Sequence, residues 1–375
     1  MKLLKFAAFF FAALFAGLLS AQDQQSSQKN PDRSYVGDYS DKPSEIMLVD
    51  AAANKERKVT LKSSSAKDFV FADSAGGELT VPKDTKTFHF AVHGGENWNR
   101  ARAAFNRGNW NEALVYMRPV VYPLLQYTPF SEETFRVHGY VEMLITALLN
   151  DERLVEAEAL VDALPLGDSP LIVPAALEVA NALADAGKVE SAMKIVNRVS
   201  LSADEPDNIA AYMKTLDRIR LRGVSKDLLM CYTKLSNMNG NPQKDVATLW
   251  MIYCDMSLGN NMSAQVYLSS LKVPQDSEEF SLSQMLKGMY KEVEKKIPDA
   301  LDMYAEGIVF GKISSDWMPE LLYKTGMAYK KSKNFVAANE IFLQINALYP
   351  DSVFAPKAKA EFVKIEKPKK TEDEE

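Results

Sequence analysis

The sequence of 375 residues has only two cysteines, Cys231 and Cys254, and only three histidines. Two cysteines are too few for a disulfide scaffold, and the histidines offer few ligands for a metal. His89 and His93 stand four apart in TFHFAVH. The alternation of that stretch is typical of a strand, where such positions lie about 13 Å apart. A G-x-S-x-G nucleophile elbow and a phosphate-binding loop are also missing. We therefore expect no metal, no cofactor and no enzymatic activity, with a hydrolase as the remote alternative.

The chain also has fewer basic than acidic residues. The chain has 44 lysines and arginines against 50 aspartates and glutamates, which gives a formal net charge of −6. Nucleic-acid backbones favour positive surface, so this acidic chain is a poor candidate for binding DNA or RNA. Apolar residues make up 47% of the sequence, which is ample for buried cores. We expect the partners to be other proteins, and envelope proteins in particular.

One long hydrophobic run, FAAFFFAALFAGLL (6–19), follows Lys2 and Lys5 and precedes Ser20 and Ala21. A basic start, an apolar run of this length and small residues at its end form a secretory signal peptide. We predict a signal at residues 1–21, cleaved after Ala21, and export to the periplasm of a Gram-negative bacterium or to the outside. Cleavage would leave no stable membrane anchor, and a retained anchor is the alternative.

Composition divides the rest of the chain. Residues 22–44 are rich in Gln, Ser and Asp and predict a disordered linker. Residues 45–93 hold five short stretches with partial period-2 alternation, EIMLVD, RKVTL, DFVFAD, ELTV and TFHFAV, and a turn at Gly76-Gly77. They predict a small antiparallel β module, a barrel or sheet of SH3-like size. Residues 367–375 form a charged tail that we expect to be disordered.

From residue 95 to residue 350 the period changes to 3.6, and one feature recurs. A Gly or polar residue is followed two positions later by a residue that is usually apolar or aromatic, and three positions further by one that is usually small. The seven copies are Gly108/Trp110/Ala113, Glu152/Leu154/Ala157, Gly187/Val189/Ala192, Gly223/Ser225/Leu228, Gly259/Asn261/Ala264, Lys295/Ile297/Ala300 and Lys333/Phe335/Ala338. Their last members are 44, 35, 36, 36, 36 and 38 positions apart. A nearly fixed period of this kind predicts a helical repeat architecture.

Each copy is expected to form two antiparallel helices joined by a tight turn. The break supplies the conformation that ends the first helix, and the alanine lets the two helices approach closely. A single pair cannot bury its apolar faces, so successive pairs stack. The predicted fold is an α-solenoid of about seven hairpins, preceded by the β module and followed by a capping helix at 351–366. Cys231 and Cys254 fall on neighbouring helices of this array, where a disulfide or two buried thiols are the alternatives.

The last copy resembles the tetratricopeptide repeat (TPR) family. The residues that fall on the family's signature positions are Leu322, Gly326, Tyr329, Phe335, Ala338, Phe342 and Pro350. The other copies keep the break and the small residue but mostly lack the paired Gly and Tyr of the first helix. The stretch IFLQINALYPDSVFAPKAKAEF is also similar to repeats of envelope proteins of the outer-membrane assembly (BamD) and cell-division coordinator types. The resemblance covers residues 95–365 and implies a protein-binding array.

The TPR resemblance further implies that the first helices of the pairs line a concave groove that holds a partner segment. Positions spaced four and then three apart form the ridge of each first helix. The candidate groove residues are Trp98, Arg102, Phe105, Met213, Arg220, Tyr253, Met256, Met285, Met289, Tyr323, Met327 and Lys330. Their methionine and aromatic side chains suit varied apolar segments, and ordinary packing between repeats is the alternative.

The sequence therefore favours a non-enzymatic scaffold or adaptor of the bacterial cell envelope. The alternative is a structural or assembly factor that associates with itself through the β module or the solenoid. The sequence leaves the oligomeric state open.

Overall fold

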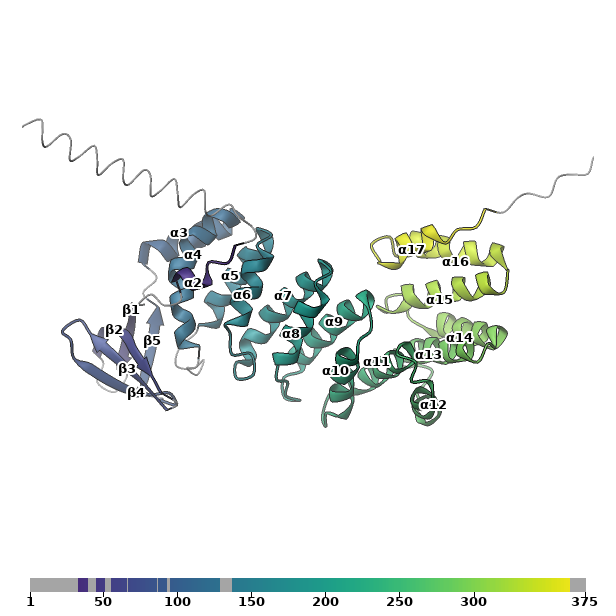
Figure 1. The fold of residues 1–375 in the computed structure, drawn as a ribbon, viewed down its shortest axis with the longest axis horizontal. Helices are drawn as coiled ribbons and strands as arrows, with labels where there is room; N and C mark the ends of the chain where they lie inside the picture. The colour runs from purple at the N-terminus through teal and green to yellow at the C-terminus, as the bar shows by residue number, and fades with distance from the viewer. Residues whose placement is uncertain are drawn as a thin grey trace, which may run out of the picture. The chain divides into compact units, whose positions relative to one another are not determined.

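The computed structural model describes residues 33–39, 45–50, 55–65, 67–85, 87–92, 95–128 and 137–364. The chain forms two compact units, which divide after Leu201. The N-terminal unit holds a β-sheet and the helices up to α8, and the C-terminal unit holds α9 to α17 (Figure 1). The predicted signal peptide and the predicted charged tail lie outside the described residues.

The strands of the N-terminal unit form one antiparallel sheet in the order β4-β3-β2-β1-β5. They are β1 (Glu45–Asp50), β2 (Lys55–Ser64), β3 (Asp68–Asp73), β4 (Glu78–Pro82) and β5 (Phe88–Val92). Phe69 and Phe71 are fully buried, whereas Val70 between them is only half-buried. This alternation is typical of a sheet with one face against a core. The predicted five-stranded antiparallel module is confirmed as a sheet.

Tyr127 of the short helix η1 (Tyr122–Tyr127) contacts the buried face of the sheet. The ring of Tyr127 stacks on that of Phe71, with centroids 6.2 Å apart. Its hydroxyl accepts a hydrogen bond from the backbone N–H of Leu61 at 3.3 Å. Burial raises the pKa of Tyr127 to about 12, so the phenol stays protonated at neutral pH. The small sheet thus completes its core with a residue from the helical part of the unit.

The helices of the N-terminal unit begin with a single turn that precedes the sheet. They are α2 (Val36–Tyr39), α3 (Gly95–Asn106), α4 (Trp110–Val121), η1, α5 (His138–Asn150), α6 (Leu154–Asp162), η2 (Pro170–Ile172), α7 (Val173–Asp185) and α8 (Val189–Arg198). Helices α3 and α4, α5 and α6, and α7 and α8 pack as consecutive pairs.

The C-terminal unit continues the pairing. Its helices are α9 (Pro206–Arg222), α10 (Lys226–Asn237), α11 (Lys244–Ser257), α12 (Asn261–Ser270), α13 (Phe280–Val293), α14 (Ile297–Phe310), α15 (Met318–Lys331), α16 (Phe335–Leu348) and α17 (Phe354–Ala360). Helix α17 lies within the predicted cap at 351–366 and packs against α15 and α16. In the described part of the chain no helix combines the length and the apolar character needed to cross a membrane.

Six of the seven predicted breaks share one backbone conformation. Gly108, Glu152, Gly187, Gly259, Lys295 and Lys333 all have φ between 58° and 86°. At each of them the next residue donates its N–H to the carbonyl five positions earlier, as Asn334 does to Tyr329 at 2.9 Å. The break residue itself donates to the carbonyl three positions earlier, as Lys333 does to Lys330 at 3.0 Å. This is the Schellman arrangement, which satisfies the last carbonyls of a helix.

The small residues of the repeat are buried where the paired helices meet. Ala113, Ala157, Ala192, Ala264, Ala300 and Ala338 are all 0% exposed. The fourth copy has Leu228 in this place, also 0% exposed, and α9 and α10 touch little, as α5 and α6 also do. Its break also differs, because Ser225 caps α10 by accepting the N–H of Leu228 at 3.1 Å.

Two glycines in the first helices make room for aromatic rings. A Cβ at Gly288 would lie 2.2 Å from the ring of Tyr304, and one at Gly326 would lie 2.4 Å from the ring of Phe342. Both rings come from the second helix of the same pair. The side chain is therefore absent at these two positions because the partner helix fills the space.

Candidate binding sites

A buried ionic cluster joins three first helices of the C-terminal unit. Arg220 of α9 donates a hydrogen bond from Nη1 to Glu320 of α15 at 2.7 Å. Its Nε and Nη2 donate to Asp217 at 3.0 and 2.7 Å. Tyr253 of α11 donates from its hydroxyl to Glu320 at 2.8 Å. Because both charged side chains are 3% exposed, they depend on each other for the stabilisation that water would otherwise give.

Aromatic rings enclose this cluster. The Arg220 guanidinium lies 3.8 Å from the centroid of Trp250 and 4.8 Å from that of Tyr253. Trp317 stands edge-on to Trp250 and donates its indole N–H to Ser281 at 2.8 Å. Rings that exclude water strengthen both the ion pair and the cation–π contacts.

Protonation in the cluster follows from these contacts. Burial works against the charged form of Glu320, but the charges of Arg220 and Lys324 and the hydrogen bond from Tyr253 outweigh it and lower its pKa. Burial likewise works against the charged form of Arg220, yet Glu320 and Asp217 raise its pKa. Burial and the neighbouring Glu320 raise the pKa of Tyr253. At neutral pH the cluster therefore holds an ionised Arg–Glu pair and a neutral phenol.

The C-terminal members of the predicted groove set divide by burial. Met213, Arg220, Met256 and Met285 are buried. Those that are half-buried are Tyr253, Met289, Tyr323, Met327 and Lys330. Helix α13 packs against α11, α12, α14 and α15, which leaves few of its side chains at the surface. The half-buried residues are the part of this set that still offers area to a partner.

Two of these half-buried residues contact the capping segment. The ring of Tyr323 lies 5.6 Å from that of Phe354 in α17. Lys330 donates to the Glu361 carboxylate at 2.6 Å. The capping segment thus covers part of the ridge on α15.

The N-terminal members of the groove set lie on α3. Trp98 packs against Tyr140 of α5 with centroids 4.5 Å apart, and Phe105 packs edge-on against Trp110 of α4 at 5.2 Å. Arg102 is exposed. Two of the three side chains therefore take part in contacts between helices, while the third faces solvent.

Cys231 of α10 and Cys254 of α11 are both buried thiols in the structure, on helices that pack together. Burial raises the pKa of Cys254 to about 12 and also raises that of Cys231, which has Tyr212 as a hydrogen-bond partner. Thiols with raised pKa values react slowly, because the thiolate is the reactive form.

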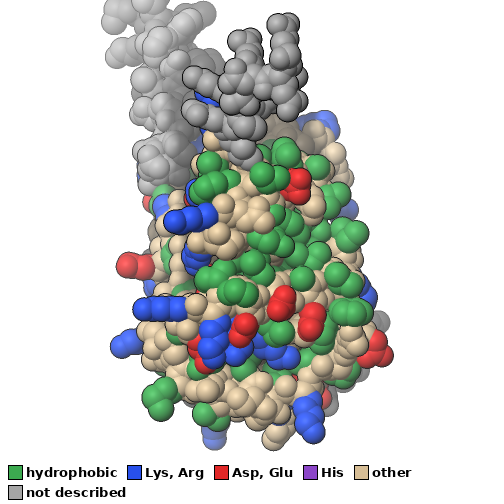
Figure 2. Space-filling view, turned by 90° about the vertical axis from the view of Figure 1, so that its right-hand side faces the viewer, with side chains coloured by type: hydrophobic (Ala, Val, Ile, Leu, Met, Phe, Trp, Pro, Cys, Tyr) green, Lys and Arg blue, Asp and Glu red, His purple; other side chains and the backbone are tan. Residues whose placement is uncertain are grey.

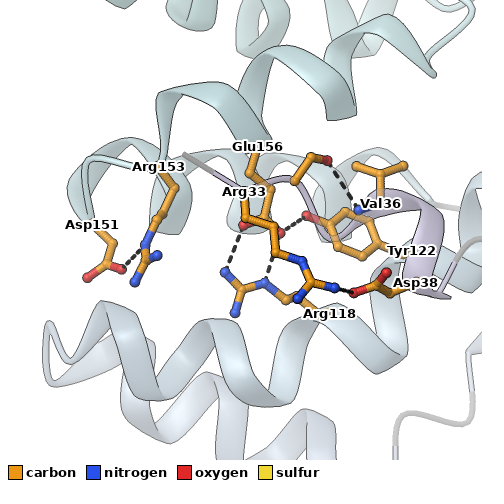
Figure 3. Close-up of polar contacts among 9 residues, drawn as sticks. Arg33, Val36, Asp38, Arg118, Tyr122, Asp151, Arg153 and Glu156 are labelled. Atoms are coloured by element: carbon orange, nitrogen blue, oxygen red, sulfur yellow. Dashed lines mark hydrogen bonds and ion pairs between the residues drawn. The ribbon is translucent and has the colours of Figure 1, made fainter. Parts of the chain in front are cut away.

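A second buried ionic cluster lies in the N-terminal unit (Figure 3). Arg118 of α4 binds Glu156 of α6 with two parallel hydrogen bonds of 2.8 Å each. The hydroxyl of Tyr122 also donates to Glu156. Burial works against the charged guanidinium, but Glu156 outweighs it and raises the pKa of Arg118. One donor stays unsatisfied, because Arg118 Nη1 has no hydrogen-bond partner among the described residues.

The segment Arg33–Tyr39, which we call the arm, lies over this second cluster (Figure 3). Tyr35 is 4% exposed, and its ring centroid lies 4.3 Å from the Arg118 guanidinium. The ring of Tyr39 lies 6.2 Å from that of Tyr122. The arm falls inside the predicted disordered linker at 22–44, and the structure instead packs it against α4, α6 and η1. The only signal for this packing in the sequence is the pair of tyrosines in a polar stretch.

Apolar side chains are exposed on the outer helices of the C-terminal unit. Val309 and Phe310 end α14 and Ile313 follows them, with 72%, 50% and 67% of their surface exposed. The hydroxyl of Tyr349 donates to the carbonyl of Ile313 at 2.8 Å, and Leu348, which precedes Tyr349 in the sequence, is also exposed. We call Val309, Phe310, Ile313 and Leu348 the apolar patch. Figure 2 views the structure of Figure 1 from its right-hand side, and hydrophobic side chains gather on the face seen there.

Within the described residues no group of three or more His, Cys, Asp and Glu side chains is arranged to hold a metal ion. His89 is exposed on β5, whereas His93 lies outside the described residues. Comparison of the sequence with models of known protein families and with curated proteins gives no match.

Proposed function

We propose that the chain is a non-enzymatic protein-binding scaffold, built of TPR-like hairpins and exported to the bacterial cell envelope. The observation that carries the proposal is the apolar patch on the outer helices of the C-terminal unit. Exposed apolar groups that gather on a folded surface, and are not scattered singly, mark sites where other proteins dock. The recurring Schellman turns and the buried alanines support the TPR-like array, because they repeat with the period of the sequence.

The patch suits docking because its side chains are held by regular structure. Val309 and Phe310 belong to α14, and the Phe310 ring stands edge-on to Phe280 of α13 at 6.1 Å. The Tyr349–Ile313 hydrogen bond fixes the loop after α14 to the end of α16. A rigid apolar surface loses little conformational entropy on binding, so more of its burial contributes to affinity.

The half-buried ridge residues of α13 and α15 offer a second contact surface for the same function. Met289 and Met327 are the methionines of the groove set that remain accessible. Their flexible thioethers adapt to apolar segments of different shape. Because the patch and the ridge consist of different residues, each can be tested with its own variants.

Site-specific photocrosslinking in envelope extract tests this proposal. A photoreactive phenylalanine analogue is placed at Ile313, with Asp302, an exposed acidic residue of the preceding helix α14, as the matched control position. We expect a defined higher-mass adduct from position 313 and a much weaker one from position 302. Val309→Glu should abolish the adduct, since a charge would have to enter an apolar contact. Equal adducts from both positions, or adducts that survive Val309→Glu, would contradict docking at the patch.

The ridge is tested in the same way through Met289→Ala and Met327→Ala. If these variants lose an adduct that Val309→Glu keeps, the partner binds along the first helices and not on the patch.

A structural factor that associates with itself is the second candidate, because the same patch could meet a second copy. Sedimentation of the purified chain separates the two functions. A dimer or higher oligomer that Val309→Glu converts to a monomer would favour self-association, whereas a monomer in both cases favours the scaffold.

A further inference from the structure

We propose that the surface beneath the arm is a peptide-binding site for short tyrosine-containing segments, and that the chain's own arm occupies it in this structure. The site is formed by α4, η1 and α6 of the N-terminal unit. It is separate from the apolar patch and from the ridges of α13 and α15, so it does not depend on the proposed function above.

The floor of this site is a buried ion pair in which one guanidinium nitrogen lacks an acceptor among the described residues. Arg118 and Glu156 are 1% and 0% exposed, yet they meet under a segment of seven described residues. Guanidinium groups stack well on aromatic faces, and a desolvated cation–π contact is among the stronger aromatic interactions. A buried arginine held flat by a bidentate carboxylate is thus presented to a ring, here the ring of Tyr35.

The arm has the character of a bound peptide. Several of its polar contacts are internal: Arg33 pairs with Asp38 at 2.8 Å, Val36 N–H donates to Ser34, and Asp38 N–H donates to the carbonyl of Tyr35. Tyr35 enters the site, and Tyr39 packs beside Tyr122. A short segment that anchors itself through an aromatic side chain is a common form of peptide recognition.

The unsatisfied Arg118 Nη1 indicates that the arm is an incomplete ligand. A buried charged donor without an acceptor carries a desolvation cost. A segment that offers a tyrosine together with an additional carboxylate or carbonyl oxygen near Nη1 would satisfy that donor. Such a segment would compete with the arm on favourable terms, because it makes the contacts of Tyr35 and one more.

A fluorescein-labelled peptide of residues 31–41, PDRSYVGDYSD, tests the site by fluorescence anisotropy against the full chain. In the Tyr35→Ala chain the arm loses its anchor, so we expect saturable binding of the peptide. The wild-type chain should bind it at least about tenfold more weakly, because its own arm competes, and a peptide that itself carries Tyr35→Ala should lose at least about tenfold in affinity. The inference is overturned if the folded Tyr35→Ala chain shows no saturable binding, or if both peptides bind equally well.

Hydrogen exchange on the wild-type chain gives a second test that needs no variant protein. Excess wild-type peptide should displace the arm and speed exchange of the amides of residues 34–39, whereas the Tyr35→Ala peptide should not. Unchanged exchange with both peptides would mean that the arm is a fixed part of the fold. That outcome would leave the scaffold proposal untouched, since photocrosslinking at Ile313 reports on the other unit.

Discussion

Arg220 and Glu320 are 100 positions apart in the sequence, and their side chains meet at 2.7 Å with Tyr253 bonded to the same carboxylate. The contact spans four consecutive helical pairs of the C-terminal unit, from the first of them to the last. Buried ion pairs of this kind add little to the free energy of unfolding compared with apolar side chains of the same size. Removal of one partner is costly, because it leaves a buried charge with less compensation. Loss of either side chain is therefore expected to destabilise the unit.

Glu320→Gln is expected to lower the free energy of unfolding by up to about 3–5 kcal/mol, because the buried Arg220 guanidinium loses its buried charged partner and keeps only the partly exposed Asp217. Urea unfolding of the purified chain measures the change. Glu278→Gln is the matched control: it breaks a pair with Lys312 that is about half exposed on both sides, and such pairs contribute less than about 1 kcal/mol. The double variant Arg220→Met/Glu320→Leu should be more stable than Glu320→Gln alone, and a larger loss in the double variant would contradict this account.

The same pair sets a pH dependence. The pKa of Glu320 is lower in the folded chain than its ordinary value, so the stabilisation is fully present above the unfolded pKa of about 4.3 and is lost as the pH falls through the folded pKa. We expect the urea midpoint of the wild-type chain to fall on acidification from pH 5 towards pH 3 by more than that of Glu320→Gln. The measurement compares the slopes of the two chains, and parallel slopes would show that other carboxylates govern the acid response.

Lys295→Gly is expected to stabilise the chain. Lys295 has φ of 61°, a left-handed conformation that costs a residue with a side chain roughly 1–2 kcal/mol, whereas the added freedom of glycine in the unfolded chain costs about 0.5–1 kcal/mol. The net gain should be a few tenths to about 1 kcal/mol in thermal unfolding. Lys296→Gly is the neighbouring control, with φ of −97°, and should be neutral or destabilising. A loss with Lys295→Gly would show that its side chain contributes more than its backbone costs.

Gly326→Ala is expected to destabilise the last helical pair by about 1–3 kcal/mol, because the new methyl group would overlap the Phe342 ring. Gly139→Ala serves as the opposite control, since Gly139 also lies in a helix and a Cβ there meets nothing within 4 Å. That change should be neutral or stabilising by up to about 1 kcal/mol. Thermal unfolding of both variants decides the matter, and equal effects would mean that helix propensity and not packing determines the glycine at 326.

Local patterns allowed much of the fold to be predicted. The five strands follow from alternation between apolar and polar residues, and the helical pairs follow from the spacing of breaks and small residues. The fourth copy, whose break has a different conformation, also differs in sequence, because Leu228 stands where the other six copies have alanine. These features depend on neighbours within a few positions, which a single sequence displays directly.

The ionic clusters and the arm could not be predicted, because they depend on contacts between distant segments. Nothing near Arg220 in the sequence points to Glu320, and Tyr35 lies in a stretch whose composition is that of a linker. The groove residues show a related limit. Spacing places Met285 on a ridge, but α13 packs against four other helices, and Met285 is fully buried. Spacing identifies the residues that share one face of a helix, but it does not show how many of those faces are covered by neighbouring helices.

The bond between Arg220 and Glu320 also changes how the C-terminal unit should come apart. In a linear stack each repeat meets only its neighbours, so the last repeat can fray while the rest stays folded. Here the last full pair carries Glu320, so it cannot detach without breaking the hydrogen bonds that Arg220 of the first pair and Tyr253 make to that carboxylate. The first and the last of the four pairs are therefore linked directly, as well as through the pairs between them. We expect the unit to unfold in one cooperative step, with amide exchange equally slow in α9 and in α15.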